Sequence, residues 1–184
     1  EIIDTNSELK IYSDNIIYQK NVNLITTNQN SKALYDIGKS IYADNFYFDR
    51  NKNILNANGN VRIENTIDDY LITGNDFTYY KNSEKIITKG ETKASIQSKY
   101  IIDTKNIIYL INENNLTSKN KTKIEDQNSK VYFSENFSYS INQEIFKGEK
   151  ILIISNHNLP NSDKIFLESA IINLKDQKFI AKNI

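Results

Sequence analysis

Residues that could do chemistry are scarce in this chain of 184 residues. It contains no cysteine, which excludes disulfides, thiolate zinc sites and thiol catalysis. Its only histidine, His157, lies in an Asn-rich segment with the sole proline, Pro160, and not beside an acid and a nucleophile on regular elements. The sequence therefore predicts no catalytic residue, no metal site, no cofactor and no enzyme activity.

Carboxylates that recur could work as the acid and nucleophile of a glycosidase. Asp14 and Asp44 lie thirty residues apart, and each is followed by an asparagine. Recurrence at this spacing favours a hydrogen-bonding role at an edge or corner of the fold. The pairs Asp68-Asp69 and Glu125-Asp126 are interpreted as turn charges, with a calcium site as the alternative.

Three lysines alternate along one segment, at Lys119, Lys121 and Lys123. This stripe is typical of a solvated strand face, and contact with anionic lipid phosphates is the alternative. The chain as a whole is neutral, with 23 basic and 23 acidic residues, which argues against nucleic-acid binding. No apolar run reaches the roughly 20 residues of a membrane-spanning helix. The first residues lack a signal-peptide pattern. The residues alone therefore do not decide between a cytosolic protein and an exported one whose signal peptide was removed.

The elements that carry these residues follow from an internal repeat of about 30 residues, present about six times. Each copy ends its first segment with two apolar residues two positions apart. These pairs are Ile16/Tyr18, Phe46/Phe48, Phe77/Tyr79, Ile107/Tyr109, Phe137/Tyr139 and Ile172/Leu174. A short polar break and a second alternating run follow. Period-two alternation predicts half-buried antiparallel strands joined as hairpins.

One irregularity recurs within the first strand of a repeat. The apolar positions run Ile41, Ala43, then Phe46, Phe48, with a step of three in the middle. A straight strand cannot keep both halves on one face across such a step, so it must bulge or turn a corner. The predicted fold is all-β: an elongated antiparallel β-jellyroll (β-clam) solenoid of hairpin repeats, forming a single domain over residues 1–184. Strands are predicted near residues 9–19, 40–48, 54–64, 70–80, 85–97, 100–111, 115–125, 130–140, 145–155, 164–174 and 178–183.

These repeats resemble the OstA-like family of lipopolysaccharide transport. The resemblance rests on residues 41–50 followed by 55–63, and it covers about residues 9–184. Residues 70–97, 121–126 and 179–184 are most similar to the N-terminal periplasmic domain of the outer-membrane assembly component, LptD. The bridge component LptA and the clasp component LptC are the alternatives. Because the sequence stops inside a repeat, it is expected to be a portion of a longer chain.

The resemblance implies a non-enzymatic carrier in the periplasm, associated with the outer membrane, that shields lipopolysaccharide acyl chains in an apolar groove. The predicted groove residues are Ile41, Phe46, Phe48, Leu55, Val61, Ile63, Phe77, Ile102, Ile107, Phe137 and Leu152. The side chains predicted to face water are Asn56, Asn58, Arg62, Lys89, Lys93, Lys119 and Lys121.

The resemblance also implies partners. Other jellyroll proteins of the transport bridge would dock by edge-strand addition, for which Ile11, Ile16 and Phe179 are the predicted residues. An outer-membrane β-barrel in the same chain and its lipoprotein plug are further implied partners.

Two other functions stay open from the sequence. A structural β-repeat scaffold would bind protein through its edge strands and would carry no lipid. A parallel β-helix, acting as an adhesin or carbohydrate-binding protein, would require parallel neighbouring strands.

Overall fold

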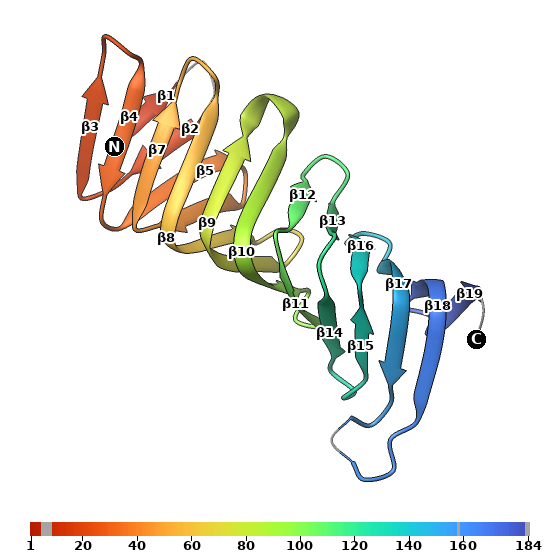
Figure 1. Cartoon of the computed structure of the whole chain (residues 1–184). Helices are drawn as coiled ribbons and strands as arrows, with labels where there is room; N and C mark the ends of the chain where they lie inside the picture. The colour runs from red at the N-terminus through yellow and green to blue at the C-terminus, as the bar shows by residue number, and fades with distance from the viewer. Residues whose placement is uncertain (5–8, 158, 183–184) are drawn as a thin grey trace.

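The computed structural model describes residues 1–4, 9–157 and 159–182, and these form a twisted, elongated array of hairpins (Figure 1). The strands are β1 (Ile2–Asp4), β2 (Leu9–Tyr12), β3 (Asn15–Gln19), β4 (Leu24–Asn28), β5 (Ser31–Asp36), β6 (Lys39–Ala43), β7 (Asn45–Asp49), β8 (Ile54–Asn65), β9 (Tyr70–Tyr80), β10 (Lys85–Ile96), β11 (Tyr100–Lys105), β12 (Ile108–Leu110), β13 (Asn115–Ser118), β14 (Thr122–Asp126), β15 (Val131–Ser134), β16 (Asn136–Ser140), β17 (Ile145–Ile154), β18 (Lys164–Asn173) and β19 (Lys178–Lys182). Within this described part, the only helical element is a 3-10 turn at Lys81–Ser83.

Every pairing between the described strands is antiparallel. The predicted all-β, antiparallel jellyroll-like fold is therefore confirmed, and the parallel β-helix is wrong.

The strands form two layers that are joined along one long side, which we call the corner. Layer A runs in the order β1, β2, β5, β6, β8, β9, β10, β11, β14, β15, β17, β18. Layer B runs in the order β3, β4, β7, β8, β9, β10, β12, β13, β16, β17, β18, β19. The long strands β8, β9, β10, β17 and β18 bend at the corner and belong to both layers. Buried apolar side chains from Leu9 to Leu174 form one cluster between the layers.

The predicted step of three marks this corner. Asp44 lies between β6 and β7, and its neighbours Ala43 and Phe46 are both buried. In β8 the pairing shifts between Asn58 and Val61, where Gly59 and Asn60 have φ values of 77° and 48°. An added Cβ at Gly59 would overlap the Asp44 carboxylate, so glycine is required both for its backbone angle and for the close approach. The predicted bend is confirmed.

Buried hydroxyl groups complete the corner from the inside. Because the bend interrupts the ladder, some backbone N–H groups lose their strand partners. Thr27 Oγ1 accepts the N–H of Phe46 at 2.8 Å, and Thr88 Oγ1 accepts that of Ile107 at 2.8 Å. The buried Ser118 and Thr122 are likewise corner residues, which explains why polar residues interrupt the apolar pattern of their repeat.

Three strands were missing from the sequence prediction: β1, β4 and β5. In β4 and β5 several inward positions are occupied by polar or small residues, Thr27, Ser31 and Ala33, so the apolar alternation is weak there. Five predicted strands are each divided in two by the corner, giving β2/β3, β6/β7, β11/β12, β13/β14 and β15/β16. The last predicted strand corresponds to β19, and its final residue, 183, lies outside the described residues.

Candidate functional site

The candidate site is the apolar interior, which two rows of side chains line from one end of the described array to the other. Antiparallel register brings one inward residue of each strand opposite the next. In layer A the row reads Ile2, Ile11, Ala33, Ile41, Ile63, Ile72, Ala94, Ile102, Ile124, Tyr132, Ile153, Ile165. In layer B it reads Tyr18, Ile25, Phe48, Leu55, Tyr79, Ile86, Tyr109, Leu116, Tyr139, Phe146, Ile172, Phe179.

The side chains of both rows are buried along the middle of the array and more exposed at its ends. All members between the terminal ones are buried. The terminal members of the layer B row, Tyr18 and Phe179, are 41% and 40% exposed. The interior is thus filled by its own side chains along its length, and an elongated apolar ligand could enter only if the layers separated.

The predicted groove residues can now be placed. Ten of them are buried between the layers, in agreement with the predicted inward orientation: Ile41, Phe46, Phe48, Leu55, Val61, Ile63, Phe77, Ile102, Ile107 and Phe137. Among the residues predicted to face water, Asn56 is half-buried, and Asn58, Arg62, Lys89, Lys93, Lys119 and Lys121 are exposed.

The inward prediction for Leu152 is wrong. Leu152 is only half-buried, whereas its neighbours Ile151 and Ile153 are buried. The corner of β17, where Lys150 has a φ of 49°, adds one residue to the strand. The alternation therefore changes phase between Gly148 and Ile151, which is the same step of three that marks the corner elsewhere.

Of the three predicted docking residues, two lie on edge strands and one does not. Ile16 lies in β3 and Phe179 in β19, and within the described residues each of these strands has one neighbour in its layer. Ile11, however, lies in β2 between β1 and β5 and is fully buried. Ile11 is therefore not an edge residue, because β1, which the sequence pattern did not reveal, covers that side.

Opposite the corner, the layers meet along a line of aromatic pairs at the hairpin-turn ends of the strands, which we call the mouth. Each pair takes one ring from each layer. The pairs, with the distances between their ring centroids, are Tyr35–Tyr79 (5.1 Å), Tyr70–Tyr109 (5.4 Å), Tyr100–Tyr139 (6.2 Å) and Tyr132–Phe146 (6.3 Å). The repeat period thus spaces these contacts along the array from β5 to β17.

Polar bonds between described residues also join the two layers across the mouth. The Tyr109 hydroxyl, which donates to Asn114 Oδ1 at 2.9 Å within layer B, lies 2.7 Å from the Tyr70 hydroxyl of layer A. Arg50, in the turn after β7, donates to Asp4 Oδ1 of β1 at 2.6 Å. Glu144 accepts hydrogen bonds from Lys99 Nζ at 2.9 Å and from the Tyr100 hydroxyl at 3.1 Å. Burial, together with the Glu144 charge, raises the pKa of Tyr100 to about 12.

Three tyrosine hydroxyls along the mouth have no hydrogen-bond partner among the described residues: those of Tyr35, Tyr79 and Tyr139. All three residues are buried. Burial is the largest cause that raises the pKa of Tyr79 and of Tyr139, so both hydroxyls stay protonated and able to donate.

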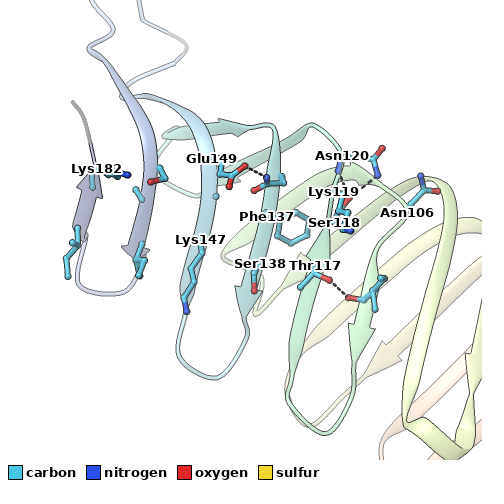
Figure 2. A pocket seen from close by; sticks show the side chains of 18 of the residues that line it. Asn106, Thr117, Ser118, Lys119, Asn120, Phe137, Ser138, Lys147, Glu149 and Lys182 are labelled. Carbon is cyan, nitrogen blue, oxygen red and sulfur yellow. Dashed lines mark hydrogen bonds between the residues drawn. The ribbon is translucent and has the colours of Figure 1, made fainter.

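A separate trough of about 1060 Å³ crosses the outside of layer B from β10 to β19. Figure 2 shows Thr117, Ser138 and Lys147 in line on neighbouring strands of this trough. The same outer row continues through four isoleucines, at Ile87, Ile108, Ile171 and Ile180. Of the predicted groove residues only Phe137 lines the trough. Sequence reasoning missed this surface, although isoleucines at one register of the otherwise polar face were a signal for it.

The recurring carboxylates lie at the corner, as predicted. Asn30 donates to Asp14 Oδ2 at 2.6 Å, and Asn60 donates to Asp44 Oδ2 at 2.9 Å. Asp68 and Asp126 make turn contacts, as expected: Asp68 Oδ2 accepts a hydrogen bond from Asn65 Nδ2 at 2.8 Å, and Asp126 Oδ1 accepts the N–H of Asn128 at 2.8 Å. The expectation of a turn charge is wrong for Glu125, which lies inside β14.

The remaining charged candidates lie on the surface. Lys121 and Lys123 make ion pairs with Glu135 and Glu125, at 3.6 and 2.9 Å. His157 is exposed. Within residues 1–4, 9–157 and 159–182, no three acidic or histidine side chains gather as a metal site, and no helix is long and apolar enough to cross a membrane.

Comparisons of the sequence and of the structure with known proteins do not show which family the chain belongs to. No protein-family model matches the sequence, and no curated protein is significantly similar to it. Among solved structures, the chain is similar to LptH from Pseudomonas aeruginosa, the LptA-homologous periplasmic component of the lipopolysaccharide transport device. The identity is 9%, the match covers 89% of this chain and 98% of that one, and the TM-score is 0.33. Similarity at this level carries no functional argument.

Proposed function

We propose that this chain is a non-enzymatic carrier domain that shields the acyl chains of lipopolysaccharide during their transport to, and assembly in, the outer membrane. The observation that carries the proposal is the pair of apolar rows that runs unbroken between the layers. The OstA-like sequence resemblance supports the choice of lipopolysaccharide as the lipid, and with it a location in the periplasm associated with the outer membrane.

Acyl chains exposed to water are strongly unfavourable in free energy, and an apolar interior removes this cost. Each CH₂ group transferred from water to an apolar surface contributes about 0.8 kcal/mol, so a chain of a dozen carbons contributes roughly 10 kcal/mol. A lipid with several chains cannot cross an aqueous compartment uncovered. Rows whose members resemble one another from strand to strand offer similar contacts along the array, so a bound chain can slide without meeting one deep trap.

Entry requires the mouth to open, because the interior is filled. The two layers share covalent chain at the corner, whereas ring contacts and a few polar bonds join them at the mouth. One hydrogen bond contributes about 1 kcal/mol net, so a few such bonds can be exchanged for contacts with a lipid. We propose that the corner acts as the hinge and the mouth as the entrance.

Partners would add at the ends of the array. β3 and β19 present the exposed terminal members of the layer B row, Tyr18 and Phe179. A neighbouring jellyroll protein that paired with these edges would extend both the sheet and the apolar row. Resemblance of residues 70–97 favours an LptD-type domain, whose further partners would be a β-barrel in the same chain and its lipoprotein plug.

Lipid extraction tests the proposal. The chain would be purified from the periplasm of a Gram-negative host, and its bound lipids would be identified by mass spectrometry. The proposal expects lipopolysaccharide in the extract, and expects less of it from Phe77→Asp, since a lone charge in the apolar interior costs several kcal/mol. Lys89→Asp, on the exposed face, is the matched control and should change nothing.

A scaffold that binds protein through its edge strands is the second candidate. It is favoured by the exposed apolar residues of β19, where Ile180 is 78% exposed. A preparation that carries no lipid, yet still pairs with a jellyroll partner through β19, would support the scaffold and contradict the carrier.

A further inference from the structure

Tyr79 and Tyr139 each bury a hydroxyl group that has no hydrogen-bond partner among the described residues and that the packing of the ring does not require. Both occupy the next-to-last position of a layer B strand segment, before a hairpin turn, sixty residues apart. Phe48 occupies the equivalent position in β7 and is equally buried. A phenyl ring therefore fills this position, and the added hydroxyl without a partner costs about 1–3 kcal/mol.

The intervening repeat shows that the position can satisfy a hydroxyl when the chain supplies a partner. Tyr109, at the same position in β12, donates to Asn114 Oδ1 at 2.9 Å and contacts the Tyr70 hydroxyl at 2.7 Å. Tyr79 and Tyr139 have ring contacts with Tyr35 and Tyr100 instead, with no hydrogen bond from their own hydroxyls among the described residues. The Tyr79 and Tyr139 hydroxyls are thus left available to donate, although each ring is paired across the mouth as that of Tyr109 is.

The place of these hydroxyls indicates which ligand group would meet them. They lie at the mouth, between an apolar interior and hairpin turns that carry Asp36, Glu84 and Glu144. A lipid whose chains fill the interior presents at this level the carbonyl that joins each acyl chain to its head group. That carbonyl is a neutral acceptor, whereas a phosphate would meet the nearby carboxylates with unfavourable charge.

We infer that Tyr79 and Tyr139 are ligand-binding residues whose hydroxyls donate hydrogen bonds to the ester or amide carbonyls of acyl chains held in the interior. This inference rests on the proposed carrier function and specifies the chemical class of its ligand: acylated lipids, as distinct from alkyl ethers of the same length.

The test compares a lipid with its carbonyl-free analogue. The whole chain would be titrated with dilauroyl phosphatidylglycerol and with the didodecyl ether of the same head group, and binding would be followed by native mass spectrometry. The parent should prefer the ester by about tenfold, the equivalent of about 1.4 kcal/mol. The double variant Tyr79→Phe/Tyr139→Phe should bind both lipids alike, with an unfolding midpoint at or above that of the parent.

Tyr109→Phe is the matched control, because its hydroxyl already has partners within the chain. It should lower the unfolding midpoint and keep the ester preference. Equal binding of ester and ether by the parent, or an ester preference that survives in the double variant, would overturn this inference and leave the carrier function standing. Failure of the parent to bind either lipid would also overturn this inference, whereas the carrier function stands or falls with the lipopolysaccharide extraction.

Discussion

At the scale of single residues, the corner is built from hydroxyl groups that replace missing backbone partners. Thr88 Oγ1 accepts the N–H of Ile107 at 2.8 Å and contacts Thr92 Oγ1 at 2.7 Å, with both threonines buried. Thr27 does the same for Phe46. A polar residue in the interior is thus stabilising here because it satisfies a donor that the bend has freed.

Thr88→Val should therefore destabilise the chain although it adds an apolar group. It leaves the Ile107 N–H buried without a partner, which costs about 1–3 kcal/mol of unfolding free energy. Urea denaturation followed by circular dichroism measures this. Thr73→Val, on the outer face of β9, is the control, and an equal effect of both changes would contradict the role given to the corner hydroxyl.

The mouth should make the chain sensitive to alkali. The pKa of Tyr100 is raised to about 12, against about 10 in an unfolded chain. Above pH 10 the unfolded state releases the proton while the folded state keeps it, so stability is fully present below pH 10 and falls as the pH rises toward 12. Unfolding free energies measured across this window should fall less steeply for Tyr100→Phe. Identical slopes for parent and variant would contradict the burial of this hydroxyl against Glu144.

At the scale of strands, the bend depends on backbone angles that few residues adopt. Gly59 and Gly90 occupy equivalent corners of β8 and β10, with φ values of 77° and 82°. They differ in their surroundings, because a Cβ at Gly59 would overlap Asp44, whereas a Cβ at Gly90 would meet nothing within 4 Å.

Alanine at these two glycines separates backbone strain from steric overlap. Gly90→Ala should cost about 1–2 kcal/mol, the penalty of the left-handed region alone. Gly59→Ala should cost clearly more, since Asp44 must also move. Thermal or urea unfolding of the two variants gives the difference directly. Equal losses would show that Asp44 is not fixed at the corner.

The sequence predicted the strands well where inward residues were large and apolar, and less well at the corners. The step of three at Ala43–Phe46 revealed the bend, but the same step at Gly148–Ile151 was missed, which placed Leu152 on the wrong face. The weak alternation of β4 and β5 hid two strands, and the short β1 hid the neighbour of Ile11. The mouth could not be predicted, because a contact such as Tyr70–Tyr109 depends on how the two layers meet and not on any spacing within one strand.

Edge strands should control association of the array. Phe179→Asp in β19 and Ile16→Asp in β3 place a charge on the two edge strands of layer B and should abolish concentration-dependent self-association in analytical ultracentrifugation. The folded signal should remain, because both side chains are at least partly exposed. Ile11→Asp should unfold the chain instead, because that residue is buried inside layer A. Association that persists in both edge variants would place the docking surface elsewhere, with the outer trough as the next surface to test.

At the scale of the whole molecule, the chain combines a proposed hinge, an apolar interior and a proposed entrance, repeated along one axis. Two surfaces compete as the place of a lipid: the interior between the layers and the trough outside layer B. Neighbouring residues of one strand point to opposite sides, so adjacent positions can separate these surfaces without any other change. Ile172 faces the interior and Ile171 lines the trough, and Leu116 and Thr117 form a second such pair.

Photo-crosslinking at these four positions distinguishes the interior from the trough as the place of the lipid. A photoreactive amino acid would replace each residue in turn, and the adducts formed in lipopolysaccharide-producing cells would be compared. A lipid in the interior should give lipopolysaccharide adducts at residues 116 and 172 and few at residues 117 and 171. Equal capture at all four positions, or capture only at 117 and 171, would contradict an interior that carries lipid.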